Sequence, residues 1–148
     1  VEAGKQLDDT WSAAADNGAY DLWVLGPNGF HRHFTGNLSA LASAKNAARP
    51  EIRVCYDVAN GDVYATLDNT AGGRAAVFSI TAREYLNGKS KTVAVPPRSK
   101  VDVNWVLAES GHWYDFEVRC NADPAWSRRF AGHLENGQPS ISDPAMGG

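Results

Sequence analysis

One strand–turn–strand motif occurs twice in this chain, and that repeat is the strongest constraint on its fold. The first copy, at residues 20–36, reads YDLWVLGPNGFHRHFTG, and the second, at residues 114–134, reads YDFEVRCNADPAWSRRFAGHL. A motif that recurs together with a tryptophan before it indicates an internal structural repeat. The matched residues are Trp11, Tyr20, Asp21, Phe34 and Gly36 in the first copy, and Trp105, Tyr114, Asp115, Phe130 and Gly132 in the second.

The repeat predicts how the chain divides. Residues 1–38 would be the C-terminal third of a first repeat, residues 39–50 an Ala-rich linker, and residues 51–134 a complete second repeat. Residues 135–148 contain Gly, Pro and Ser without periodicity, so we expect a mobile tail there. Because the first residues align with the interior of the second repeat, we expect the chain to be a piece of a longer protein.

Turn signals recur about every ten residues, the spacing typical of an all-β sandwich. We therefore predict an antiparallel immunoglobulin-like or fibronectin-like sandwich of seven strands, preceded by three strands from the preceding repeat. Those three could extend the sheet of the complete repeat or pair with another chain across an exposed edge, giving self-association. The three are predicted at 5–13, 20–26 and 30–36, and the seven at 51–58, 63–69, 74–81, 91–95, 100–107, 113–121 and 126–133.

Charge and hydropathy exclude some classes of partner. The 148 residues carry a net charge of −3, so we expect no nucleic-acid partner. No apolar run approaches the roughly 20 residues that a membrane-spanning helix needs.

The two cysteines, Cys55 and Cys120, lie on predicted strands of the complete repeat. A disulfide in an exported protein and two buried free thiols are both consistent with that placement.

The candidate binding residues are aromatic and basic. Arg32 and Arg128 recur between aromatic residues, and we favour a structural role in which each stacks on a ring and pairs with Asp21 or Asp115. The alternative is a surface for a phosphate or a quaternary ammonium group. Trp23, Arg32, Arg128 and Trp126 are therefore the candidate binding residues. Trp11 and Trp105 recur in register and should belong to the core, whereas Trp23 should face outward.

Little in the sequence points to catalysis. His31 and His33 lie on the same face of a strand, which can suit a metal, but no third ligand is near, and we favour exposed histidines. There is no Gly-x-Ser-x-Gly nucleophile signature and no phosphate-binding loop. We therefore predict no catalytic residue, no metal and no cofactor.

The runs YDLWVLGPNGFHRHFTG, VYATLDNTAG and YDFEVRCNADPAWSRRFAGHLENG resemble the C-terminal domain of exported bacterial phospholipases C that hydrolyse phosphatidylcholine or sphingomyelin. The resemblance covers nearly the whole chain, as far as about residue 137. In that family a catalytic domain related to alkaline and acid phosphatases is followed by two tandem copies of this domain.

The resemblance implies a non-catalytic accessory module of an enzyme that converts phosphatidylcholine to diacylglycerol and phosphocholine. The partner would be the N-terminal catalytic domain, which would hold the nucleophile and any metal, and a phospholipid surface is a further possible contact. Family export by the twin-arginine route implies a secreted or periplasmic location. The alternative is a free-standing module that binds carbohydrate or a lipid headgroup.

Overall fold

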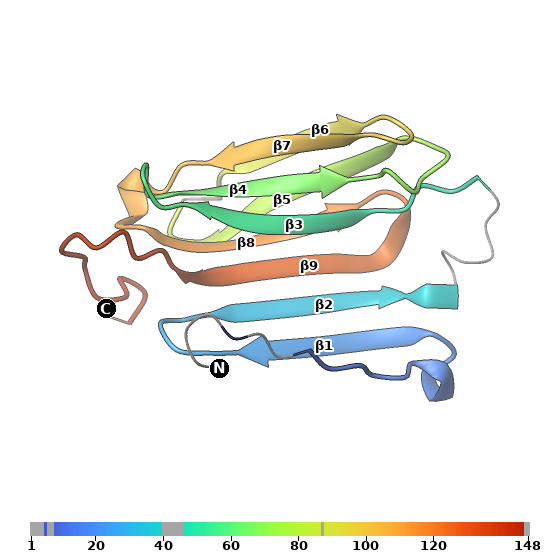
Figure 1. Ribbon diagram of the computed structural model, residues 1–148, viewed down its shortest axis with the longest axis horizontal. Helices are drawn as coiled ribbons and strands as arrows, with labels where there is room; N and C mark the ends of the chain where they lie inside the picture. The colour runs from blue at the N-terminus through green and yellow to red at the C-terminus, as the bar shows by residue number, and fades with distance from the viewer. Residues whose placement is uncertain (1–4, 6–7, 40–45, 87, 147–148) are drawn as a thin grey trace.

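The computed structural model describes residues 5, 8–39, 46–86 and 88–146, and in these residues nine strands form two antiparallel sheets (Figure 1). The larger sheet has the order β1-β2-β9-β8-β5-β6 and the smaller has the order β3-β4-β7. The larger sheet is built from β1 (Ala19–Leu25), β2 (His31–Asn37), β5 (Ala76–Glu84), β6 (Ser90–Val95), β8 (Trp113–Cys120) and β9 (Asp123–His133). The smaller is built from β3 (Glu51–Asp57), β4 (Asp62–Asp68) and β7 (Lys100–Trp105). Two 3-10 turns, η1 (Ala14–Asp16) and η2 (Ala108–Ser110), precede β1 and β8.

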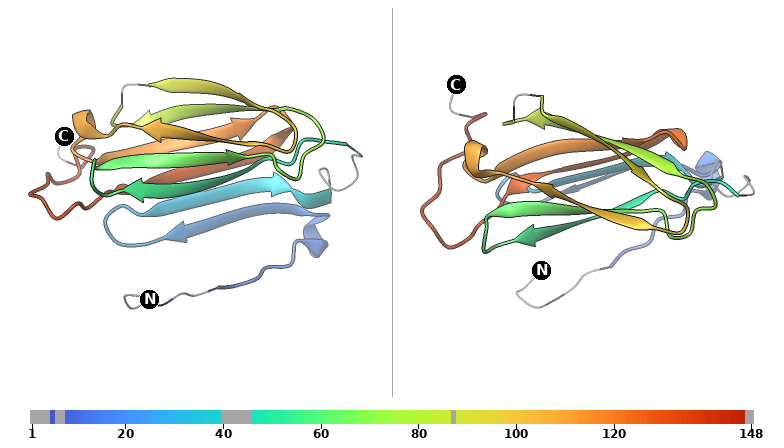
Figure 2. Two further views of the ribbon diagram at one scale, coloured as in Figure 1. Left: turned by 45° about the horizontal axis from the view of Figure 1, so that its top comes forward. Right: turned by 90° about the horizontal axis from the view of Figure 1, so that it is seen from above.

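The seven strands β3–β9 form the predicted sandwich, because their alternating apolar residues meet between the two sheets (Figure 2). β4 contributes Val63 and Leu67, and β5 contributes Phe78, all fully buried. Trp105 of β7 packs on Phe116 of β8 with 5.5 Å between ring centroids. All seven strands predicted for residues 51–134 are confirmed.

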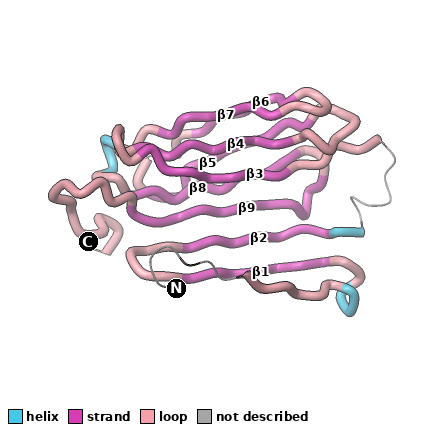
Figure 3. Tube along the Cα trace, viewed as in Figure 1, coloured by secondary structure: helices cyan, strands magenta, loops and turns pink. Residues whose placement is uncertain are grey.

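The first repeat extends the larger sheet within the same chain. β2 pairs antiparallel with β9, from His31 opposite Ala131 to Thr35 opposite Ser127. In Figure 3 the β1–β2 hairpin continues the strand array beyond β9. The smaller sheet ends at β3, so no strand of it lies over β1 in the described part of the chain.

The prediction of a strand at 5–13 is wrong for residue 5 and residues 8–13, which are not strand; residues 6 and 7 lie outside the described residues. The corresponding strand of the second repeat, β7, exists as a strand because it pairs with β4. Residues 8–13 have no such partner among the described strands, and an unpaired segment cannot satisfy its backbone groups as a strand does. The prediction that Trp11 belongs to the core is also wrong, since Trp11 is 60% exposed while Trp105 is 1% exposed.

The cysteines are both free: Cys55 is exposed on β3 and Cys120 is buried on β8, in the other sheet. Half of the predicted linker, residues 40–45, lies outside the described residues. The tail beyond β9, expected to be mobile, lies against the sandwich: Trp113 donates from Nε1 to the carbonyl of Ile141 at 3.0 Å, and the Tyr85 hydroxyl donates to Asp143 at 2.9 Å. No helix in the described residues is long and apolar enough to cross a membrane.

Candidate functional site

The two copies of the repeated hairpin meet edge to edge through equivalent residues. In the β2–β9 pair His33 lies opposite Arg129, which is the same position of the second copy. Arg32 lies opposite Phe130, and Phe34 lies opposite Arg128. This exchange of positions is the pattern of an isologous contact, so a local two-fold axis passes through the His33–Arg129 pair.

The repeated arginines cross this axis to the tyrosines of the opposite hairpin. Arg32 donates from Nη2 to the Tyr114 hydroxyl at 3.0 Å, and Arg128 donates from Nη2 to the Tyr20 hydroxyl at 2.9 Å. The Nη1 atoms follow the same symmetry. Each donates at 2.7 Å to a carbonyl of the opposite strand, Ala131 or Thr35, and at 2.9 Å to the carbonyl just before its own residue.

The repeated glycines make room for these tyrosines. Tyr20 lies directly opposite Gly36, and Tyr114 lies directly opposite Gly132. A Cβ atom at Gly36 would overlap the Tyr20 hydroxyl, and one at Gly132 would come within 3.0 Å of the Tyr114 hydroxyl. The tyrosine therefore lies across the glycine of the adjacent strand to reach the other hairpin, which explains why the two residue types recur together.

The two arginines differ in the side chain that each contacts on β3. Arg32 donates to the Tyr56 hydroxyl at 2.8 Å, and Arg128 donates from Nε to Glu51 at 3.2 Å. Both guanidinium groups also lie over aromatic rings, Arg32 at 4.1 Å from the Phe30 centroid and Arg128 at 4.6 Å from that of Trp126. Burial raises the pKa of the Tyr114 phenol, with the Arg32 charge opposing that shift.

Three of the four candidate binding residues lie in the interior. Arg32 is 9% exposed, Arg128 is 6% exposed and Trp126 is 1% exposed, and the Nη atoms of both arginines donate to the partners given above. Only Trp23, at 56% exposed, faces solvent as expected. The structural role of the two arginines, stacked and hydrogen-bonded, is the one the geometry fits.

The prediction that Arg32 and Arg128 pair with Asp21 or Asp115 is wrong, because these carboxylates lie beside other basic residues. Asp115 accepts two hydrogen bonds from Arg129, at 2.8 and 2.5 Å, and Asp21 lies 2.6 Å from His33 Nε2. The two pairs are equivalent under the two-fold axis and lie on the outer face of the sheet. The hydrogen bonds that Arg129 donates to Asp115 raise the pKa of Arg129. Sequence reasoning missed these pairs, although a basic residue at the same position of each copy was the available signal.

On the outer face, Trp23 lies flat on two histidines. Its ring centroid is 4.8 Å from that of His31 and 4.0 Å from that of His33, and its Nε1 donates to Asp21 at 2.9 Å. Burial, with Arg129 nearby, lowers the pKa of His31. In the part of the chain that the structure describes, no three His, Cys, Asp or Glu side chains are grouped as metal ligands.

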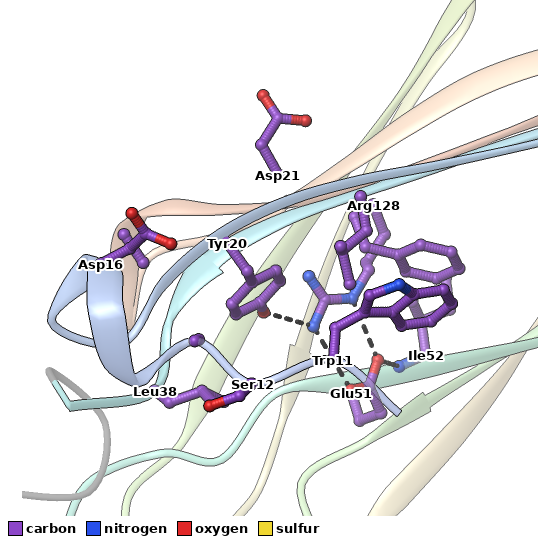
Figure 4. Close-up of a pocket in the computed structure, with 13 residues that line it drawn as sticks. Trp11, Ser12, Asp16, Tyr20, Asp21, Leu38, Glu51, Ile52 and Arg128 are labelled. Carbon is purple, nitrogen blue, oxygen red and sulfur yellow. Dashed lines mark hydrogen bonds and ion pairs between the residues drawn. The ribbon is translucent and has the colours of Figure 1, made fainter. Parts of the chain in front are cut away.

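A groove of about 1010 Å³ lies on the inner face of β1 (Figure 4). Its walls are mainly apolar, and the Arg128–Glu51 pair and the Tyr20 hydroxyl form its polar end. Trp11 lies beside that ion pair, while Asp21 points away from it (Figure 4). The apolar residues that line it include Trp11, Leu22, Phe34, Leu38 and Ile52.

Comparison with known proteins covers both copies of the hairpin. The family described as "Bacterial phospholipase C, C-terminal domain" matches residues 1–37 and 50–133. The chain is 42% identical to a non-hemolytic phospholipase C of Burkholderia pseudomallei and 38% identical to one of Pseudomonas aeruginosa, in each case over 99% of this chain. A hemolytic phospholipase C of Pseudomonas aeruginosa is 36% identical over 98% of this chain. The chain spans about a fifth of the length of these relatives, 20%, 21% and 20% respectively.

Proposed function

Since this chain belongs to the bacterial phospholipase C C-terminal domain family, we propose that it is a non-catalytic module of a longer phospholipase C. The observation that carries the proposal is that the repeated motif makes its hydrogen bonds to its own second copy. Its two arginines are buried and each donates to the tyrosine hydroxyl of the opposite hairpin, so these residues are used to join the two hairpins.

The chemistry would belong to the rest of the enzyme. We propose a catalytic domain N-terminal to this chain as its partner, and phosphatidylcholine as the substrate of that domain. A secreted or periplasmic location fits such an enzyme. The relatives are phospholipases C of which this chain matches only a fifth, which supports a module carried by a larger enzyme.

A hydrolysis assay tests this proposal. The purified 148-residue chain should release no phosphocholine from phosphatidylcholine vesicles and no nitrophenol from p-nitrophenylphosphorylcholine. The longer protein, expressed with the sequence that precedes this chain, should hydrolyse both. Turnover by the 148-residue chain that survives repeated purification would overturn the proposal.

The exposed Trp23 favours a second candidate function, binding of a lipid headgroup. Its indole has one face on His31 and His33 and remains 56% exposed, beside the Asp21 carboxylate. An open aromatic face next to a carboxylate suits a quaternary ammonium group such as choline. Arg32, Arg128 and Trp126 have no part in this candidate because they are buried.

Choline titration followed by tryptophan fluorescence tests the headgroup site. Binding at Trp23 should give a saturable change that Trp23→Leu removes. Trp11→Leu is the matched control, because Trp11 is similarly exposed, at 60%, but lines the groove on the opposite face. An unchanged titration in Trp23→Leu, or no saturable signal in the unsubstituted chain, would rule this candidate out.

A further inference from the structure

Exposed apolar side chains gather at one end of the sandwich, which we call the apolar end. They come from the end of β1, from loops 58–61 and 106–112, and from the tail, which all lie at the left of Figure 1. Between 44% and 84% of each side chain is exposed, and the residues are Leu25, Val58, Val106, Ile141 and Met146. In the described loops that join strands at the opposite end, Leu38 is the one exposed large apolar side chain.

Hydrogen bonds between loops make the apolar end one surface. Asn28, in the turn between β1 and β2, donates from Nδ2 to Glu135 of the tail at 2.5 Å. The tail is joined to the next loop by the amide of Leu134, which donates to the His112 carbonyl at 3.0 Å. His112 Nδ1 in turn lies 2.9 Å from the carbonyl of Gly61, in the turn between β3 and β4. The loops of both sheets therefore hold their apolar side chains on a shared platform.

The two ends of the sandwich differ in charge. The loops of the apolar end carry three carboxylates and one Lys, whereas the described loops at the opposite end carry three Arg and one Asp. The residues are Glu109, Glu135, Asp143 and Lys89 at the apolar end, and Arg49, Arg74, Arg98 and Asp16 at the opposite end. An anionic lipid surface attracts basic groups and would repel the apolar end. The choline ammonium groups that cover a phosphatidylcholine surface complement its carboxylates.

Trp23 lies where a headgroup layer would meet the apolar end. It shares the outer face of β1 with Leu25, two residues closer to the middle of the strand. Two residues of a strand span about 7 Å, and apolar side chains at a bilayer surface reach about 5–10 Å into it. Insertion of Leu25 would therefore place the Trp23 indole at the depth of the headgroups, where tryptophan is enriched in membrane proteins.

We propose that the apolar end binds the surface of a zwitterionic phosphatidylcholine bilayer by inserting its apolar side chains. Binding of this kind grows with the apolar area removed from water, and five exposed side chains on one surface supply that area. The acidic loops select an uncharged bilayer over an anionic one. The surface belongs to this chain alone, so its test needs neither catalysis nor a longer protein.

Sedimentation with sucrose-loaded vesicles tests the apolar end in the 148-residue chain. The chain should bind phosphatidylcholine vesicles, and binding should persist at about 0.5 M NaCl, because salt does not screen the burial of apolar side chains. Binding to phosphatidylglycerol vesicles alone, or binding that this salt abolishes, would overturn the inference, because the basic end would then be the contact. Absence of binding to both would overturn it too and indicate a protein partner. Vesicle binding without hydrolysis by the longer protein would reject the proposed function alone.

Two substitutions, one from each sheet, locate the contact. Leu25→Ser and Val106→Ser should each lower the partition coefficient onto phosphatidylcholine vesicles by at least about threefold, because each removes one inserted side chain. Leu38→Ser is the matched control, because Leu38 is 58% exposed but lies at the opposite end. All three side chains are exposed, so the melting temperatures should stay the same. An unchanged partition in Leu25→Ser or Val106→Ser, or an equal loss in Leu38→Ser, would contradict insertion through the apolar end.

Discussion

Tyr20 and Arg128 are 108 residues apart in sequence, yet Arg128 Nη2 donates a hydrogen bond of 2.9 Å to the Tyr20 hydroxyl. The equivalent bond joins Arg32 to Tyr114 in the opposite direction, 82 residues apart. Together the two bonds close a symmetric contact around the His33–Arg129 pair. The Tyr, Gly and Arg residues of the repeated motif therefore each take part in the contact between the two hairpins.

The two repeated tryptophans should differ sharply when they are truncated. Trp105→Ala removes a side chain that is 1% exposed and packed on Phe116, so we expect the free energy of unfolding to fall by about 3–5 kcal/mol. Trp11→Ala removes one that is 60% exposed, and its cost should stay below about 1 kcal/mol. Urea unfolding followed by circular dichroism measures both. Similar losses in the free energy of unfolding for the two variants would show that Trp11 is buried against the sandwich, contrary to this prediction.

The thiols should react at very different rates. Cys55 is exposed, whereas Cys120 is buried and burial raises the pKa of its thiol, which lowers its thiolate fraction. A thiol-reactive chromophore should label one cysteine quickly in the folded chain and the second only on unfolding. Fewer than two thiols in unreduced, unfolded protein would instead indicate a disulfide.

His31 should make the chain less stable in mild acid. Burial and the Arg129 charge lower the pKa of its imidazole below the ordinary value of 6.5. The unfolded chain then binds more protons than the folded one, so the stability that His31 contributes is full above pH 6.5 and is lost as the pH falls through the folded pKa. We expect unfolding free energy to drop less between pH 7.5 and pH 5.5 in His31→Gln than in the unsubstituted chain. The other histidines are the same in both proteins, so an equal or larger drop in the variant would contradict this role.

The sequence was sufficient for the strands of the two hairpins and of residues 51–134, and for the alternation of the hairpins. Turns with Asn-Gly or Gly-Gly follow β3, β4 and β5, and the two-residue period placed Trp23 and Phe34 on their strand faces, with Trp23 exposed as expected. The repeat offset also singled out the tyrosines, arginines and glycines of the contact, but it did not predict that the two copies meet.

What the sequence could not provide was the partner of each side chain. Glu51 and Tyr56 reach the arginines only because β3 packs across β9, a long-range placement that no local pattern encodes. The strand expected at 5–13 failed for a similar reason, since a strand depends on a hydrogen-bonded neighbour as well as on its own composition. Trp11 recurs in register with Trp105, but register alone does not bury a side chain.

A double-mutant cycle on Tyr20 and Arg128 tests the central claim most directly. Free energies of unfolding would be measured for Tyr20→Phe, Arg128→Met and the double variant, with Tyr64→Phe in place of Tyr20→Phe as the control cycle, because Tyr64 is exposed on β4 in the other sheet. We predict a coupling energy of about 1 kcal/mol or more between Tyr20 and Arg128, and none above about 0.3 kcal/mol for Tyr64. Additive effects of Tyr20→Phe and Arg128→Met would contradict the claim that the crossed bonds join the two repeats.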